Sequence, residues 1–312
     1  MRLRGHFWTL APFLRDSLSP PRAPASTEWK TTCADPALGD VTLTGELSQS
    51  GESDTLVIVV HGLGGSATSY YAMRAARAVE TAGLHSLRLN LRGADRRGGD
   101  YYHAGLTDDL AATLESPVLT AYARVLILAY SLGGNMTLRY LSGSPDPRVR
   151  AAVTICAPVD LARGARAIDR PHKTPYRRHV LRGLKEIYQE VASRGRVPLP
   201  IDRALRIDSI ERWDEEVISP RHGFDGAEDY WAKTSAYSVL DDVRVPTLFI
   251  AEEQDPMVLI GDVRPWVEGR VNIRPLITNR GGHVGFPHKV DLGIGTRGTF
   301  EDQVIQWMLA PT

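Results

Sequence analysis

The chain has 312 residues, 43% of them hydrophobic, which is enough for one α/β domain with a sizeable core. Its 37 basic and 37 acidic side chains balance, so no overall electrostatic attraction favours nucleic acid as a partner. Two cysteines, Cys33 and Cys156, argue against a disulfide scaffold or a cysteine-based metal site and favour a reducing cytoplasm. The nine histidines lack metal-binding spacing, and we expect neither a metal nor a cofactor.

The N-terminal segment carries two arginines and an apolar stretch, but Pro12 and the pair Arg15-Asp16 interrupt it before it resembles a signal peptide. We expect a short segment packed on the domain surface. A peripheral anchor that makes weak membrane contact is the alternative. The longest apolar runs, such as residues 56–60, are far shorter than the ~17–25 residues of a transmembrane helix. Residues 17–40 are rich in Pro, Ser and Thr and predict an irregular lead-in.

From about residue 55 the sequence alternates between strand and helix patterns. Strands are predicted at 56–60, 86–91, 125–129, 151–155, 246–251 and 271–276, and helices from Ser66 or Ser69 to 82, then at 106–114, 132–141 and 300–309. Such alternation is typical of a mostly parallel central sheet covered by helices on both faces. We therefore predict a single α/β domain over residues 1–312.

Residues 161–237 interrupt this alternation with helical stretches and no clear strand. Five apolar side chains share one helical face there: Val180, Leu181, Leu184, Ile187 and Tyr188. A helical insertion between two strands of a sheet is typical of a lid over a ligand site, so we expect a lid over residues 161–237.

Ser131 lies between the predicted strand 125–129 and the helix that follows it. The turn Ala129-Tyr130-Ser131-Leu132-Gly133 nearly matches the small-x-Ser-x-small pattern that exposes a nucleophilic hydroxyl between a strand and a helix. Small residues are needed two positions either side of the serine because strand and helix almost touch there. Ala129 replaces the usual glycine with the next smallest residue. The pattern predicts a catalytic serine.

A serine hydroxyl needs a base to remove its proton and an acid to hold that base. In α/β sheets these partners lie in loops after the strands. Asp255 follows the strand 246–251, with Glu252 and Glu253 as alternatives for the acid. His283 follows the last strand between flexible glycines and is the predicted base; a histidine that only fills the loop is the alternative. The order Ser131, Asp255, His283 is that of α/β-hydrolases.

The loop after the first predicted strand, residues 61–65, lies at the same edge of the sheet. Backbone N–H groups of Leu63 and Leu132 are the expected donors to the oxyanion that forms during attack. We expect His61 to be structural. The same loop formally fits a Gly-x-Gly-x-x-Ala dinucleotide fingerprint, but Asn90 stands where an acidic ribose ligand belongs, which argues against that alternative.

Residues 163–185 contain eight basic side chains and one acidic side chain, Asp169. We expect a solvated face of the lid, and an attraction to anionic head groups or a membrane surface is the alternative. The eight are Arg163, Arg166, Arg170, Lys173, Arg177, Arg178, Arg182 and Lys185.

These motifs resemble family four of the AB hydrolase superfamily, the YheT-like bacterial hydrolases and their eukaryotic relatives. The resemblance covers nearly the whole chain. It rests on the segments 5–10 (GHFWTL), 61–66 (HGLGGS), 90–93 (NLRG), 130–136 (YSLGGNM), 176–181 (YRRHVL), 255–256 (DP) and 281–286 (GGHVGF).

The resemblance implies an α/β-hydrolase fold and hydrolysis of carboxylic esters, with short- to medium-chain acyl esters or acylglycerols as substrates. The implied partners are therefore small ester or lipid molecules. An acyltransferase that uses an alcohol as acceptor is the alternative, because the same triad serves both reactions. A non-catalytic binding protein on this fold is a third hypothesis, against which the complete triad argues.

Overall fold

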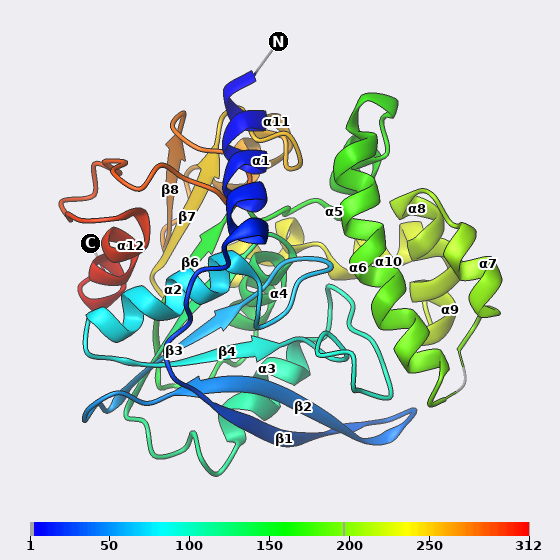
Figure 1. Cartoon of the computed structure of the whole chain (residues 1–312), viewed down its shortest axis with the longest axis horizontal. Helices are drawn as coiled ribbons and strands as arrows, with labels where there is room; N and C mark the ends of the chain where they lie inside the picture. The colour runs from blue at the N-terminus through cyan, green and yellow to red at the C-terminus, as the bar shows by residue number, and fades with distance from the viewer. Residues whose placement is uncertain (1–2, 196, 312) are drawn as a thin grey trace.

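The computed structural model describes residues 3–195 and 197–311, which form a central eight-stranded sheet with helices on both faces (Figure 1). The spatial order of the strands is β1-β2-β4-β3-β5-β6-β7-β8. β1 and β2 pair antiparallel, as do β2 and β4, and all other neighbours are parallel. The strands are β1 (Thr27–Asp35), β2 (Gly39–Ser48), β3 (Thr55–Val60), β4 (His85–Asn90), β5 (Arg124–Tyr130), β6 (Val149–Ile155), β7 (Thr247–Glu252) and β8 (Ile273–Thr278).

The helices outside the insertion cover the sheet or lie along its edge. They are α1 (Leu3–Leu18), α2 (Tyr70–Thr81), α3 (Thr107–Glu115), α4 (Leu132–Ser142), α11 (Ile260–Val267) and α12 (Phe300–Leu309). α2 and α12 pack on one face of the sheet, while α3, α4 and α11 pack on the other. None of the helices in the described ranges combines the length and apolar character needed to cross a membrane.

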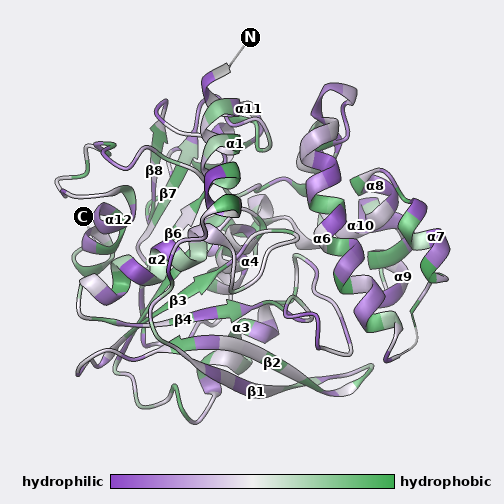
Figure 2. Cartoon of the chain, in the orientation of Figure 1, coloured by the Kyte–Doolittle hydropathy of each residue, from purple (hydrophilic) through white to green (hydrophobic). Residues whose placement is uncertain are grey.

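The central strands are apolar along their whole length because both faces of the sheet are covered. In β3, Leu56, Ile58 and Val60 enter the core beneath α3 and α4, whereas Val57 and Val59 enter the core beneath α2 and α12. Figure 2 shows β3 and β7 as mostly green arrows, while α6 alternates between purple and green bands. The predicted strands and the helices at 70–81, 107–115, 132–142 and 300–309 are confirmed within a few residues.

The segment between β6 and β7 is helical. It contains α5 (Leu161–Ile168), α6 (Thr174–Ala192), α7 (Ile201–Arg206), α8 (Ile210–Trp213), α9 (Ser219–His222) and α10 (Ala227–Thr234), joined by short 3₁₀ and π turns. α6–α10 form a separate group at the right of Figure 1. The apolar face predicted around Val180 and Ile187 is buried, which fixes how α6 packs on the domain.

The irregular lead-in expected over residues 17–40 is found only at residues 19–26, which lie in neither a helix nor a strand. α1 extends to Leu18 through Pro12, and β1 and β2 form an antiparallel hairpin at the sheet edge. β1 was not recognised because an edge strand buries few side chains: Trp29 and Cys33 are buried, and most of their neighbours remain exposed or half-exposed. The short helix α11 was also missed.

Candidate active site

Ser131 occupies a sharp turn between β5 and α4, with a backbone φ of 51°. A positive φ is unusual for a residue with a side chain and is retained here by the packing around it. A Cβ added at Gly62 would lie 2.9 Å from the Ser131 Cβ, and one added at Gly133 would lie 2.5 Å from the His61 carbonyl oxygen. Ala129 is fully buried within β5, and the turn forms with alanine at that position.

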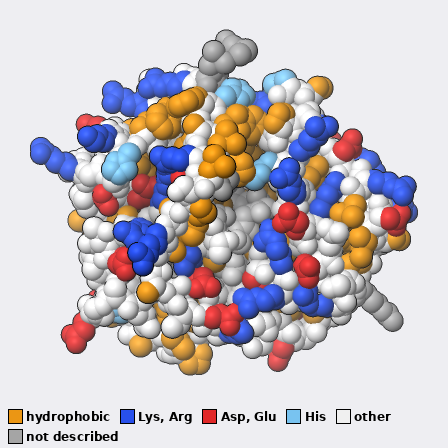
Figure 3. All heavy atoms as spheres, viewed as in Figure 1, with side chains coloured by type: hydrophobic (Ala, Val, Ile, Leu, Met, Phe, Trp, Pro, Cys, Tyr) orange, Lys and Arg blue, Asp and Glu red, His pale blue; other side chains and the backbone are white. Residues whose placement is uncertain are grey.

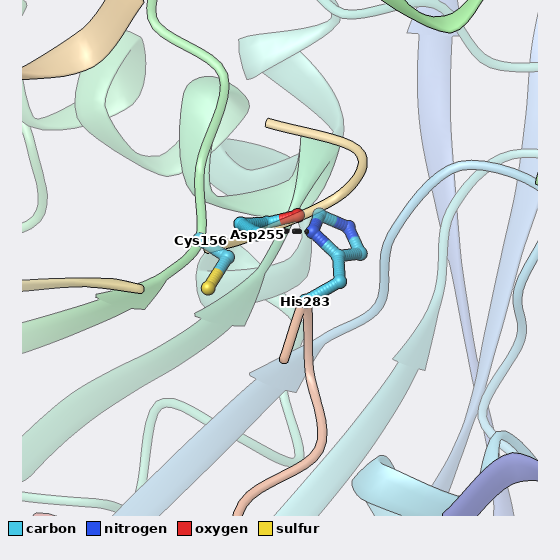
Figure 4. Close-up of side chains that lie close together, drawn as sticks. All are labelled: Cys156, Asp255 and His283. Atoms are coloured by element: carbon cyan, nitrogen blue, oxygen red, sulfur yellow. Dashed lines mark hydrogen bonds and ion pairs between the residues drawn. The ribbon is translucent and has the colours of Figure 1, made fainter. Parts of the chain in front are cut away.

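The structure brings Ser131, His283 and Asp255 together from three loops. His283 Nε2 lies 2.9 Å from Ser131 Oγ. The Nδ1 atom of His283 lies 2.8 Å from Asp255 Oδ2 (Figure 4). The other carboxylate oxygen, Oδ1, accepts hydrogen bonds from the N–H groups of Met257 (2.7 Å) and Val258 (3.0 Å). Asp255 is therefore oriented by its own loop. With Nδ1 protonated toward the carboxylate, Nε2 can accept the serine proton.

The alternative acids in the same loop do not contact the imidazole in the described structure. Glu252 is buried at the end of β7 and accepts a hydrogen bond from Gln254 N–H; burial raises its pKa to about 7. Glu253 is exposed and pairs with Arg264 at 3.6 Å. Asp255 is the carboxylate of the three that reaches His283.

The N-terminal helix α1 packs against the loop that carries His283. Thr9 Oγ1 accepts a 2.9 Å hydrogen bond from the backbone N–H of His283 and donates a 2.7 Å hydrogen bond to the carbonyl of Gly5. A side chain at Gly282 would collide with the backbone of Thr9, and one at Gly5 would collide with the carbonyl of Gln254. α1 thus touches both the base loop and the acid loop. Sequence reasoning noted the 5–10 segment without assigning it this position.

His61 has two hydrogen-bonding partners on the backbone. Its Nε2 accepts from Leu91 N–H at 3.1 Å, so the proton resides on Nδ1, which donates to the Gly62 carbonyl at 2.8 Å. Complete burial lowers its pKa to about 4, which keeps the ring neutral. His61 therefore acts as a structural crosslink, as expected from the sequence.

The loop after β3 is held from three directions. Gly62 N–H donates to the Tyr71 hydroxyl at 3.0 Å, and Gly64 N–H donates to the Tyr102 hydroxyl at 2.6 Å. A Cβ added at Gly183 of α6 would lie 2.8 Å from Gly64 Cα and would also collide with the Gly64 carbonyl oxygen. The inserted helix therefore packs directly on this loop, backbone against backbone.

A cavity of about 730 Å³ opens beside Ser131 and His283, within the range typical of small-molecule sites. Leu63 and Leu132 also line it. Leu132 is the first residue of α4, so its N–H has no acceptor within the helix. Much of the wall comes from the inserted helices, including Leu161, Ala165, Ile168, Tyr176, Val180 and Trp231.

Asp214 is a carboxylate in this mostly apolar wall, and no motif in the sequence marks it as a site residue. Its Oδ2 accepts a 2.7 Å hydrogen bond from the Trp231 indole N–H. Burial, opposed by that hydrogen bond and reinforced by nearby Asp169, raises the pKa of Asp214 to about 7. It therefore offers the cavity a polar group that is partly protonated near neutral pH.

Cys156, Asp255 and His283 lie close enough for their ligand atoms to share a metal ion (Figure 4). However, the Asp255 carboxylate and the His283 Nδ1 already bind each other. Burial next to Asp255 raises the pKa of the Cys156 thiol well above its usual value, which disfavours the thiolate that a metal requires. The arrangement suits a proton relay better than a metal site.

Comparison with known proteins shows which family the chain resembles. Residues 57–291 match the profile described as the Alpha/beta hydrolase family. The chain is 30% identical to YheT of Escherichia coli over 238 residues, covering 74% of this chain and 70% of YheT. It is 23% identical to the Saccharomyces cerevisiae monoacylglycerol lipase over 252 residues, covering 76% of this chain but 56% of that enzyme. The resemblance to YheT-like hydrolases and their eukaryotic relatives is confirmed.

Among solved structures, the Pyrococcus furiosus esterase Pf2001 superposes with a TM-score of 0.54 and 18% identity, covering 85% of this chain and 91% of that one. At 18% identity, this similarity supports the fold alone. The predicted α/β-hydrolase fold, with its mostly parallel sheet between two helical layers, is confirmed.

Proposed function

The chain belongs to the alpha/beta hydrolase family, and we propose that it is a serine hydrolase that cleaves carboxylic esters. The observation that carries this proposal is the continuous chain of hydrogen bonds from Asp255 through His283 to Ser131. His283 removes the proton from Ser131 as the hydroxyl attacks the ester carbonyl, while Asp255 orients the imidazole and stabilises its charged form. Collapse of the tetrahedral intermediate expels the alcohol and leaves an acyl-enzyme. Water, activated by His283, then releases the acid.

The backbone N–H groups of Leu63 and Leu132 stabilise the oxyanion in this proposal. Both residues line the cavity next to Ser131, at the ends of β3 and β5. Loss of one such donor typically raises the barrier by about 3–4 kcal/mol. The hydrogen bonds from Gly62 to Tyr71 and from Gly64 to Tyr102 therefore support catalysis by fixing the loop that carries Leu63.

The substrates we propose are short- to medium-chain acyl esters or acylglycerols. The cavity beside Ser131 has mostly apolar walls, which suit an acyl chain. Residues 161–237 act as the lid, because α5 and α6 supply much of the wall and α6 packs on the loop at Gly64. The name of the yeast relative, a monoacylglycerol lipase, supports the same substrate class.

A cytoplasmic location belongs to the same proposal. Cys33 and Cys156 are both buried and unpaired, as is typical of proteins in a reducing compartment.

Labelling with a fluorophosphonate probe tests the role of Ser131. The wild type and a Ser142→Ala control should be labelled, because Ser142 bonds to the Arg139 carbonyl at the far end of α4. Ser131→Ala should not be labelled, and its turnover of p-nitrophenyl esters should fall on the order of 10⁶-fold. Retained turnover in Ser131→Ala would refute the proposal, and a probe that fails to label the wild type would favour a non-catalytic binding protein.

Product analysis in dilute alcohol separates hydrolysis from acyl transfer. Hydrolysis should dominate over transfer across p-nitrophenyl esters of graded chain length. More transferred ester than free acid would instead assign the chain to the acyltransferase alternative.

A further inference from the structure

Helix α1 carries an exposed apolar stripe. Phe7, Leu10, Leu14 and Leu18 are 58%, 40%, 57% and 88% exposed, and they are four of the nine large hydrophobic side chains exposed on the described part of the molecule. Their spacing of three or four residues places them on one side of the helix. Figure 3 shows hydrophobic side chains gathered over the position of α1, with Lys and Arg on both sides.

The opposite side of α1 is fixed to the domain. Gly5, Thr9, Pro12 and Asp16 are buried, with the same helical spacing as the stripe but on the other face. Thr9 bonds to the base loop, and Asp16 accepts hydrogen bonds or ion pairs from Arg74 of α2. The stripe therefore faces outward because the other face already holds the helix in place.

The stripe leads into the cavity. Leu10 belongs to both, since it is partly exposed and also lines the cavity. Phe13 lines the cavity from α1, and its ring packs edge-on against His179 of α6, with centroids 4.7 Å apart. α1 and α6 therefore both line the cavity, and this part of its wall adjoins the apolar stripe.

Basic side chains of α6 also line this part of the cavity. Several of the basic side chains in residues 163–185 have partners within the chain: Arg163 pairs with Asp160, Arg166 pairs with Glu228, and Arg177 donates to the Asp169 carbonyl. Five of the eight are exposed, as expected for a solvated face, whereas Lys173 is buried.

Arg178 and Arg182, in contrast, are exposed, line the cavity, and form no ion pair within residues 3–195 and 197–311. On α1, the described acidic side chain is the buried Asp16, so the stripe itself carries no exposed negative charge.

We propose that α1 and the first half of α6 dock on an anionic lipid surface. The apolar stripe enters the acyl boundary of the lipid, Arg178 and Arg182 contact the phosphates, and the cavity mouth faces the lipid phase. An amphipathic helix bordered by cations binds in this way. Docking of this kind does not depend on the chemistry assigned to Ser131, but it gives an ester dissolved in lipid a direct path to the cavity.

Sedimentation with vesicles tests the stripe. The wild type should bind phosphatidylcholine vesicles that contain phosphatidylglycerol. Leu14→Ser/Leu18→Ser should reduce the partition coefficient about tenfold or more, because each buried leucine contributes substantially to transfer. Val118→Ser/Val271→Ser, which alters exposed apolar residues away from the cavity, should bind as the wild type does. Phe7→Ser alone should give a smaller loss in the same direction.

Hydrolysis of a soluble ester without vesicles keeps this test separate from the proposed chemistry. Leu14 and Leu18 do not line the cavity, so their double variant should retain wild-type turnover of p-nitrophenyl acetate. A wild type that turns over the ester but does not bind vesicles would overturn the docking proposal alone. Vesicle binding without turnover would overturn the proposed function alone.

The double variant Arg178→Gln/Arg182→Gln tests whether the two cations contribute to vesicle binding. This variant should lose several-fold in binding to anionic vesicles, and the loss should shrink at high salt. Arg203→Gln/Arg206→Gln, on α7 outside the cavity, is the matched control. Equal binding by both arginine variants would overturn the role of the cations. If sedimentation velocity shows that the leucine stripe instead joins two copies of the chain, and vesicles do not bind, the lipid proposal is wrong.

Discussion

Gly183 is the residue whose replacement most directly tests whether the inserted helices support the active-site loop. It lies within α6 and packs on the backbone of Gly64, next to the proposed oxyanion donor Leu63. Gly183→Ala should therefore slow ester hydrolysis and destabilise the fold. The matched exchange Gly261→Ala, in α11, meets no atom within 4 Å and should do neither.

The preference of helices for alanine is common to both exchanges. Their effects on stability differ in sign because the new Cβ collides with other atoms only at position 183. Alanine is favoured over glycine within helices by about 0.5–1 kcal/mol. At position 183 the new Cβ would lie 2.8 Å from the Cα and 3.0 Å from the carbonyl carbon of Gly64, both backbone atoms that no rotamer change can move. Overpacking of this kind costs about 1–3 kcal/mol. We expect Gly183→Ala to lose roughly 1–2 kcal/mol of stability and Gly261→Ala to gain about 0.5 kcal/mol.

Urea unfolding and steady-state kinetics on a soluble ester measure both effects. Complete loss of an oxyanion donor costs about 10²–10³ in kcat, so a partial displacement of the loop should reduce kcat about tenfold. Equal stability and equal kcat for Gly183→Ala and Gly261→Ala would refute the reasoning. It would mean that α6 can move away from Gly64 without disturbing the loop, and that the inserted helices are not mechanically coupled to the site.

Two further exchanges test groups that surround the triad. Thr9→Val removes the acceptor for the His283 N–H and should lower kcat about tenfold with little change in KM, whereas Thr9→Ser should retain most activity; equal kinetics would contradict a positioning role for Thr9. Asp214 has a pKa raised to about 7 by burial, so the folded protein retains a proton that the unfolded chain releases, and this contribution to stability falls between about pH 4 and pH 7. Asp214→Asn should therefore stabilise the protein more at pH 8 than at pH 4.5, by on the order of 2 kcal/mol in urea unfolding; the same gain at both values would contradict the pKa assignment.

The triad could be predicted from sequence because its members follow local rules. Ser131 sits in a turn whose small neighbours are visible in the sequence, and Asp255 and His283 each follow a recognisable strand. In a parallel sheet the ends of such strands share one edge, so the chain order and the strand assignment together predict that the three side chains meet. The distances of 2.9 Å and 2.8 Å in the structure agree with that expectation.

Other parts of the site could not be predicted because they depend on contacts between distant segments. Asp214 lies in no motif, and its altered pKa arises from burial against Trp231 and the cavity. Thr9 reaches His283 across 274 positions of the sequence, a contact that no periodicity encodes. The hairpin β1–β2 was missed for a related reason, since an edge strand with one exposed face lacks the apolar run that marks the central strands.

The glycines around the triad show how such distant segments are joined. Side chains at Gly5, Gly183 and Gly282 would each collide with the backbone of another segment: the acid loop, the loop after β3, and α1 respectively. In the sequence, these glycines look like ordinary glycines of loops and helices. The backbone atoms that exclude a side chain belong to segments far away in the chain. In three dimensions they bring α1 and α6 against the loops that hold His283 and Leu63. Since Thr9 also bonds to the His283 N–H, the proposed docking helix is tied directly to the loop of the proposed base. We therefore expect a variant that loosens α1 to change both vesicle binding and kcat.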